Sequence, residues 1–193
     1  MTDADLVARA RQGDTAAFGE LVDRHRTAVF RAALAALGSR ADAEDAAQDA
    51  FLLAFRRLDT FRGNAAFKTW LLAIAWRQAI NHRRNVVRIL KRMVMPTAEH
   101  ADDEATIASV AEGAPTPEQI ASGRERLAIV IREIRELPAP LRDAIVLAQS
   151  GAYTYEEIAA MLGCAVGTVK WRVSEARRTL KRRLAERGQI EVA

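Results

Sequence analysis

Residues 154–173 read TYEEIAAMLGCAVGTVKWRV, and this stretch decides the fold of the C-terminal part of the chain. Thr154 and Glu157 have the spacing at which each side chain satisfies an unpaired backbone N–H at the start of a helix. Gly163 suits the left-handed conformation that ends a helix. Because a second helical pattern begins at Val166, the sequence predicts two short helices joined by a tight turn, a helix-turn-helix.

The second of these helices is basic and has one apolar stripe. The stripe consists of Val169, Val173, Ala176, Leu180 and Leu184, which recur at helical spacing. The positions between them include Lys170, Arg172, Arg177, Arg178, Lys181, Arg182 and Arg183. Such a helix suits DNA, with its first turns in the major groove and later basic residues on phosphates. Taken alone, a solvated basic helix packed on a core would give the same pattern.

Composition favours a helical protein that binds a polyanion. The chain has 193 residues, 50% of them hydrophobic, with abundant alanine and few β-branched runs. Its net charge is +4. Basic residues outnumber acidic ones in 1–95 and in 127–193, whereas acidic residues dominate 96–126. Two basic segments around an acidic one indicate nucleic acid as the partner rather than a small anionic substrate.

Several classes of protein are disfavoured. No apolar run approaches the roughly 20 residues that span a bilayer, and no signal peptide is evident, so we expect a cytoplasmic protein. Cys164 is the only cysteine, and His25, His82 and His100 lack metal-ligand spacing. A Gly-rich phosphate loop and a Ser/His/Asp set are both missing. We therefore expect no cofactor, no metal and no enzymatic activity.

The N-terminal part is predicted to form helices over 4–11, 14–37, 42–58 and 66–90. In the third helix the predicted inward stripe is Ala47, Ala50, Phe51, Ala54, Phe55 and Leu58. The opposite stripe is Asp42, Asp45, Gln48, Asp49, Leu52 and Arg56. An acidic face with a leucine at its centre is typical of a protein-docking surface, although a solvated face looks much the same.

The fourth helix combines tryptophans with arginines. Its predicted inner stripe begins at Phe67 and Leu71, while Trp76 and Ile80 lie on another face with no apparent core to cover. Aromatic rings among cations are typical of single-stranded DNA binding, because stacking contributes about 1–3 kcal/mol per base. Trp70 or Trp76 taken alone could equally belong to a core, but the basic neighbours favour nucleic acid.

The domain boundaries follow from a change of pattern. Residues 96–118 contain prolines, a glycine and acids, and are expected to form a flexible acidic linker. Helical spacing resumes at 127–137 and 140–150, before the helix-turn-helix. The sequence therefore predicts an all-α protein of two small helical domains, 1–95 and 119–193, the second a four-helix unit.

These motifs resemble a known family. Residues 42–51 (DAEDAAQDAF) and 67–71 (FKTWL) resemble region 2 of sigma-70-type initiation factors. Residues 137–142 (LPAPLR), 155–159 (YEEIA) and 166–170 (VGTVK) are similar to region 4. With these two regions and a short acidic linker alone, the chain resembles the extracytoplasmic-function (ECF) subgroup, whose members are often held inactive by an anti-sigma factor and act in stress responses.

The resemblance assigns expected roles. Core RNA polymerase would be bound at its beta-prime clamp helices by Asp42, Asp45, Gln48, Asp49 and Leu52, with a further contact to the beta flap. The minus-10 element of promoter DNA would be captured and opened by Arg62, Asn64, Lys68, Trp70, Trp76, Arg77, Asn81, Arg83 and Arg84. The minus-35 element would be read by Thr168, Lys170, Trp171, Arg172, Ser174, Arg177 and Arg178. The linker would pass through a basic channel near the RNA exit path.

The chain departs from the family pattern at three positions. Ala165 replaces a common serine cap, which should forgo about 1 kcal/mol. Trp171 and Glu175 stand where many members have serine and arginine, so the minus-35 sequence cannot be carried over. Trp171 either contacts a thymine methyl or sugar, or packs on the preceding helix.

Two other classes of function remain as alternatives. A conventional repressor or activator would bind a duplex, usually a palindrome, without polymerase, and its N-terminal domain would sense a ligand or dimerise. An enzyme is disfavoured because no set of catalytic groups converges.

Overall fold

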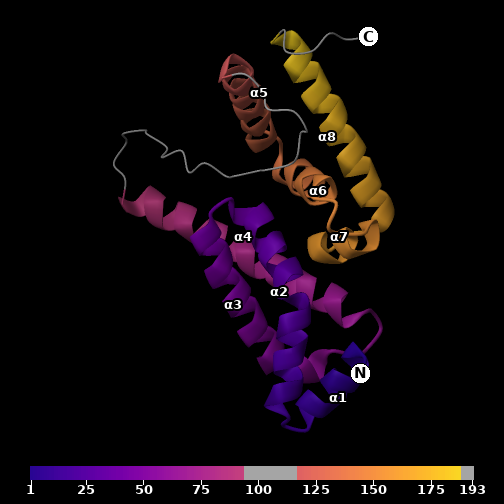
Figure 1. Cartoon of the computed structure of the whole chain (residues 1–193). Helices are drawn as coiled ribbons and strands as arrows, with labels where there is room; N and C mark the ends of the chain where they lie inside the picture. The colour runs from indigo at the N-terminus through magenta and orange to yellow at the C-terminus, as the bar shows by residue number, and fades with distance from the viewer. Residues whose placement is uncertain (94–116, 188–193) are drawn as a thin grey trace.

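A computed structural model describes residues 1–93 and 117–187 and, within these, the side chains of residues 1–85 and 126–187. The N-terminal unit contains α1 (Asp3–Arg11), α2 (Thr15–Leu37), α3 (Arg40–Arg56), a short 3-10 helix (Leu58–Thr60) and α4 (Phe67–Met93). The C-terminal unit contains α5 (Pro117–Arg135), α6 (Ala139–Gln149), α7 (Tyr155–Leu162) and α8 (Val166–Glu186) (Figure 1). No strand occurs in the described residues, which confirms the all-α prediction.

The ends of the helices follow their capping residues. The backbone N–H of Glu157 donates to Thr154 Oγ1 at 3.2 Å, and the N–H of Thr154 donates to a Glu157 carboxylate oxygen at 3.0 Å. Gly163 ends α7 with φ of 63°. Helix α3 begins at Arg40, earlier than predicted, because the hydroxyl of Ser39 accepts from the N–H of Asp42 at 3.4 Å.

The predicted linker falls largely outside the described residues. Helix α5 begins at Pro117, so the last two residues of the predicted linker 96–118 are helical, and this helix starts well before the predicted residue 127. A proline fits the first helical position because the N–H that it lacks would have no partner there. Flexibility of residues 96–116 stays a prediction.

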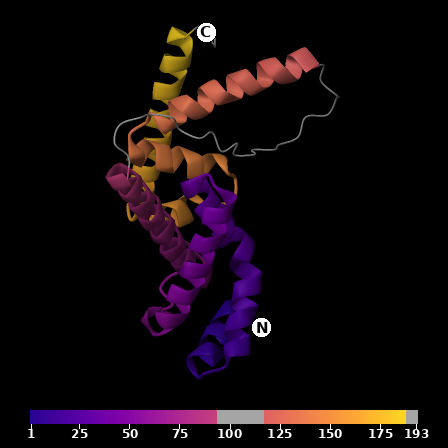
Figure 2. The same ribbon diagram turned by 90° about the vertical axis from the view of Figure 1, so that its left-hand side faces the viewer.

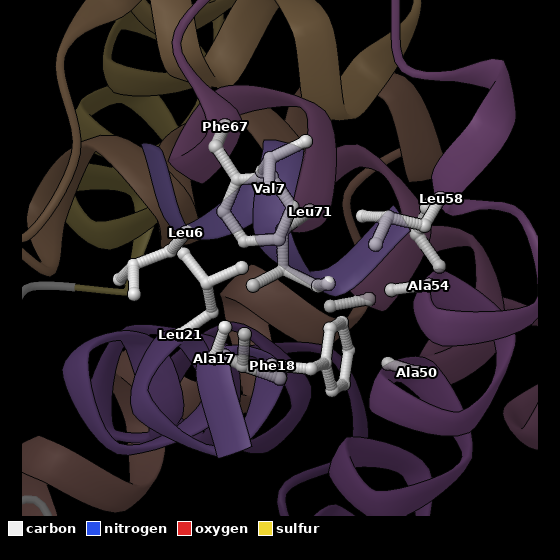
Figure 3. Packing of buried hydrophobic residues seen from close by; sticks show 14 of the residues in the cluster. Leu6, Val7, Ala17, Phe18, Leu21, Ala50, Ala54, Leu58, Phe67 and Leu71 are labelled. Carbon is white, nitrogen blue, oxygen red and sulfur yellow. The ribbon is translucent and has the colours of Figure 1, made fainter. Parts of the chain in front are cut away.

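The N-terminal unit has its own apolar core. Helices α1 to α4 contribute buried side chains that converge in Figure 3, among them Leu6, Phe18 and Leu71. Most of the predicted α3 stripe is buried, but Phe55 is 43% exposed, so its placement in the inward stripe was wrong. The ring of Phe55 packs edge-on against the ring of Phe18, with 4.9 Å between the two ring centroids, and the rest of the side chain is exposed.

The C-terminal unit packs around α8. Of its predicted stripe, Val169, Val173, Ala176 and Leu180 are buried, as predicted, whereas Leu184 is half-buried. The buried carboxylate of Glu133 on α5 lies 2.8 Å from Arg187 and 3.6 Å from Arg183, so its charge is compensated. The described helices α5–α8 confirm the four-helix unit.

The two units lie against each other. Helix α7 packs on α4, and α6 reaches α2, as the two views in Figures 1 and 2 show. One apolar cluster contains buried side chains of both units, including Leu72 and Trp76 from α4 and Ile158 and Met161 from α7. Among the helices described, none has the length and apolar character to cross a membrane.

Candidate functional site

An acidic surface with apolar residues covers one side of α3. The side chains of Asp45, Gln48 and Asp49 are exposed, and Leu52 is 57% exposed. The exposed ring of Phe55 adds to the apolar part. Asp42 is half-buried at the start of the helix, where its carboxylate lies 3.6 Å from Nε2 of His82. We call Asp45, Gln48, Asp49, Leu52 and Phe55 the α3 surface; exposed large apolar side chains among acids suit a protein partner.

The tryptophan face of α4 is covered by the C-terminal unit. Trp76 is only 4% exposed and shares an apolar cluster with side chains of α6, α7 and α8, while Ile80 is half-buried. The expectation that this face has no core to cover is therefore wrong for this structure. The physical reason is that the second core is assembled from helices of both units, which the sequence patterns show only one helix at a time.

Two cations of this face are paired across the units. Nζ of Lys68 lies 2.8 Å from a carboxylate oxygen of Glu157. The guanidinium of Arg83 donates to the carbonyl of Ala36 at 3.1 Å and lies 3.5 Å from the carboxylate of Asp143 on α6. These cations are held where the C-terminal unit meets α4.

The remaining polar residues of the predicted minus-10 set are accessible. Arg62, Asn64, Arg77, Asn81 and Arg84 are exposed. The last three line a groove of about 490 Å³ between the units, whose other wall includes Pro140, Gly163 and Arg172. The groove therefore runs along the side of α4 on which the sequence predicts DNA.

Trp70 occupies a different environment from Trp76. It is half-buried, and its ring centroid lies 5.4 Å from that of Phe61 and 5.7 Å from that of Phe67. This aromatic group packs against the N-terminal core. Trp70 thus contributes to packing and keeps part of its ring accessible.

Helix α8 presents its polar side outward. Lys170, Ser174, Arg177 and Arg178 are exposed, Thr168 is half-buried, and Arg178 pairs with Glu175 at 2.6 Å. Trp171 is 61% exposed, so it does not pack into the preceding helix. The half-buried Arg172 instead points toward the turn, where it lies 3.6 Å from Sγ of Cys164.

The start of α8 lacks a side-chain cap. Ala165 occupies the N-cap position with extended backbone angles, and no side-chain hydrogen bond caps the helix there. This confirms the expectation drawn from the absence of serine.

Three residues of the contact between the units were not among the predicted site residues. They are Asp143, Glu157 and Tyr153, whose hydroxyl donates to the carbonyl of Ala28 at 2.7 Å. Burial raises the pKa of the Tyr153 phenol, nearby Glu157 raises it further and Arg31 opposes the shift. The role of Glu157 in this contact gives no separate signal in the sequence, because an acid at the start of a helix is already explained by capping. No group of metal-binding side chains occurs in the part of the chain that the structure describes.

The fold and the exposed basic helix α8 define the class: a two-unit helical protein that carries a helix-turn-helix. Family models agree with this class and make it specific. The family model for sigma-70 region 2 matches residues 21–88, and the family model for sigma-70 region 4 matches residues 127–180. The chain belongs to the sigma-70 family, in its ECF subgroup.

Relatives and solved structures give the same assignment. The ECF RNA polymerase sigma-E factor of Escherichia coli K12 is 36% identical over 190 residues, covering 93% of each chain, and that of Haemophilus influenzae is 35% identical, covering 95% and 96%. The structure of CnrH in complex with the cytosolic domain of CnrY matches with a TM-score of 0.62 and 28% identity, over 96% of this chain and 99% of that one. The sigma factor RpoE of Bartonella quintana, in complex with the anti-sigma factor NepR, matches with a TM-score of 0.58 and 25% identity, over 87% and 96%.

Proposed function

We propose that this chain binds core RNA polymerase and directs promoter recognition, DNA melting and the start of transcription. The observation that carries the proposal is that the chain has both sigma regions over most of its length, each with its own exposed polar surface. The chain lends specificity to the polymerase and has no catalytic role of its own. Its place of action is the cytoplasm, where the polymerase works.

The α3 surface is the proposed site for the polymerase. Asp45 and Asp49 supply negative charge around the exposed Leu52, and Asp42 and Gln48 lie on the same side of the helix. Such a surface fits a partner that has basic residues around an apolar centre. We expect the beta-prime clamp helices to have this character. Charge complementarity of this kind raises association rates and selects the partner.

The α4 face is the proposed site for the minus-10 element. Arg62, Asn64, Arg77, Asn81 and Arg84 are accessible to phosphates and bases, and Lys68 and Arg83 add charge once their carboxylate partners withdraw. Stacking on Trp70 and Trp76 would hold unpaired bases.

The polar side of α8 is the proposed site for the minus-35 element. Thr168, Lys170, Trp171 and Ser174 lie in its first turns, where a recognition helix contacts base edges. Arg172, Arg177 and Arg178 supply phosphate contacts, which position the helix without reading sequence.

An anti-sigma factor is a further proposed partner. Two of the solved structures that resemble this chain are complexes, one with the cytosolic domain of CnrY and one with the anti-sigma factor NepR. The similarity covers 96% and 87% of this chain, so both sigma regions have counterparts in those complexes.

Two charge variants test the division of labour. Asp49→Arg should weaken binding to core polymerase by at least about tenfold, because a reversed charge faces a basic partner. Arg77→Ala should leave polymerase binding intact and reduce strand opening, measured by permanganate reactivity of promoter thymines. Asp23→Arg and Arg26→Ala, at exposed sites on α2, are matched controls.

The outcomes separate the competing functions. If Asp49→Arg and Arg77→Ala lower polymerase binding equally, the assignment of surfaces is wrong. If the purified chain binds a palindromic duplex tightly and gives no polymerase-dependent opening across a genomic promoter library, a conventional regulator is the correct function.

A further inference from the structure

We propose that Arg11 on α1 is a positioning residue for the α3–α4 loop, residues 61–66, and that it thereby sets how sharply the chain discriminates bases of the minus-10 element. This loop carries Arg62 and Asn64, both of them exposed. The inference rests on the proposed function only for the contact of this loop with the minus-10 element. Arg11 lies before residue 21, where the match to region 2 begins, so the resemblance gives it no role.

The guanidinium of Arg11 binds the backbone where the loop begins. Its Nε and Nη2 donate to the carbonyl of Leu58 at 3.2 and 3.0 Å, and Nη2 also donates to the carbonyl of Phe61. Leu58 starts the 3-10 helix, and Phe61 is the residue that follows it. One side chain of α1 thus holds backbone that lies 47 to 50 residues further along the chain.

An arginine suits this place for two physical reasons. Carbonyls at the end of a helix lack backbone donors, and a cation there interacts favourably with the helix dipole. The planar guanidinium also presents several N–H groups in a fixed fork, which a lysine ammonium does not reproduce. Arg11 itself is exposed, so removal of its side chain leaves no cavity in the core.

The ring of Phe61 fixes the start of the loop a second time. Its centroid lies 5.6 Å from that of Phe67, the buried first residue of α4, and 5.4 Å from that of Trp70. The two ends of the loop therefore contact each other. Gly63, with φ of 75°, adopts the left-handed conformation between them. The residues from Arg62 onward form a short arch that is held at both ends.

The position of this arch decides which base its side chains accept. A polar contact discriminates only when its atoms are held to within about 0.5 Å of the correct geometry. By holding the start of the arch before DNA arrives, Arg11 also lowers the entropy lost when the loop is ordered on binding. A wrong base is then not accommodated by a shift of the loop. Loss of the Arg11 contacts should consequently reduce discrimination.

Direct contact of Arg11 with a DNA phosphate is the competing explanation for a basic residue here. Three hydrogen bonds to backbone carbonyls already occupy its guanidinium, which favours positioning. The two explanations also predict different results. A phosphate contact strengthens binding to all sequences alike, whereas positioning acts at the bases that the arch contacts.

Hydrogen exchange tests the contact in the free chain. Arg11→Met keeps a long side chain and loses the donors. Exchange at the backbone amides of Thr60 and Phe61, which the 3-10 turn protects, should rise several-fold. Arg9→Met, the control, removes a cation of the same helix that pairs with Asp14, and should leave these amides unchanged. Equal exchange in Arg11→Met and in the unmodified chain overturns the proposal.

Strand opening tests the effect on discrimination. The probe is the strongest template recovered from a genomic promoter library with core polymerase and the unmodified chain, together with single-base changes in its minus-10 element. Each mismatched base pair typically costs about 5- to 150-fold, and Arg11→Met should lower this ratio several-fold at one or more positions. Arg11→Lys should recover part of the loss, and Arg9→Met should cause none. Ratios at the minus-35 element, which the other unit reads, should stay the same in all variants.

Each result separates positioning from a structural or an electrostatic role. A chain that is only less stable opens every template less and keeps all the ratios, which contradicts the proposal. Unchanged ratios with full recovery in Arg11→Lys indicate a phosphate contact and contradict it too. If circular dichroism shows that Arg11→Met is unfolded, Arg11→Lys decides, because it should still show a partial loss in both measurements.

The two measurements also distinguish this proposal from the proposed function. Absence of opening with the unmodified chain contradicts the proposed function, and with it the role of the loop at the minus-10 element. Exchange at Thr60 and Phe61 needs no polymerase, so it shows independently whether Arg11 holds the loop. Normal opening by the unmodified chain with unchanged ratios in Arg11→Met leaves the proposed function standing and overturns the role of Arg11.

Discussion

Two tryptophans on two basic helices have opposite environments. Trp76 on α4 is 4% exposed, whereas Trp171 on α8 is 61% exposed. Helix α4 lies between the rest of its own unit and the C-terminal unit, so it buries side chains on two sides. Helix α8 buries one stripe and leaves the polar side of its first turns, with Lys170, Trp171 and Ser174, to solvent. An aromatic side chain among arginines therefore indicates a DNA-binding surface only where that side chain is not buried in a second apolar core.

Because the two tryptophans differ in exposure, a substitution at each of them measures a different property. A change at Trp171 acts chiefly on binding, because the residue is 61% exposed. A change at Trp76 acts on stability, on the contact between the units and on DNA at once. The role of α4 in DNA binding is better tested by substitutions at Arg77 or Asn81, because these side chains are exposed and their removal should not destabilise the fold.

Trp76→Ala is expected to have the largest effect. Removing a buried indole should lower the free energy of unfolding by about 3–5 kcal/mol, since a cavity is left in the shared cluster. Urea unfolding followed by circular dichroism gives this value. A loss below about 1 kcal/mol would mean that Trp76 is accessible in solution, and the contrast with Trp171 would disappear.

Trp171→Ala is expected to act on DNA and not on folding. The free energy of unfolding should change by less than about 0.5 kcal/mol, because the ring is exposed. Competition between duplexes for the polymerase complex should show a loss of about 1–3 kcal/mol of discrimination at one base pair of the minus-35 element. Trp171→Phe should retain part of it, whereas unchanged discrimination in Trp171→Ala would show that the ring does not read DNA.

Ala165→Ser is expected to stabilise α8 at its uncapped start. The backbone at this position is already extended, so the new hydroxyl can accept from an N–H of the first turn and add about 1 kcal/mol. Thermal unfolding measures the gain. Ala165→Val, which adds side-chain atoms but no hydroxyl and is a poor N-cap residue, is the control, and an equal effect of both substitutions would argue against capping.

Tyr153→Phe is expected to have the smallest effect at neutral pH, below about 1 kcal/mol, because one hydrogen bond is lost. The raised pKa of the phenol means that the folded form favours the protonated tyrosine. Its contribution is complete below the unfolded pKa of about 10 and declines as the pH rises above it. In a Trp70→Phe/Trp171→Phe chain, where Trp76 is the only tryptophan, emission should therefore shift to longer wavelength at alkaline pH, and it should shift less when Tyr153→Phe is added. Identical dependence of the emission on pH with and without Tyr153→Phe would show that Tyr153 does not stabilise the contact between the units.

The sequence predicts each helix better than it predicts the contact between the units. The apolar stripe of α8 and the cap at Thr154 depend on residues within one turn of each other, and both are confirmed. The covering of Trp76 depends on α6 and α7, more than sixty residues further along the chain, and no local pattern encodes it. The exposure of Phe55 was wrongly predicted for a related reason. Helical spacing shows which side of a helix faces the core, but it does not show how far around the helix the buried surface extends.

Surface roles are predicted to a different extent. Exposure of Asp49, Leu52 and Trp171 agrees with the roles assigned from the resemblance, while contact with polymerase or DNA depends on partners that the fold does not contain. Asp143 and Tyr153 gave no signal in the sequence, because a half-buried acid and an aromatic in a turn fit many environments.

Transcription with purified components tests the central claim most directly. Core RNA polymerase, this chain and a library of genomic promoters on linear DNA should give discrete transcripts whose templates share two sequence elements, with permanganate-reactive thymines at the downstream one. Omission of the chain should abolish both signals, and Asp49→Arg should reduce both at the same chain concentration. Transcripts and opening that are the same with and without the chain would contradict the account.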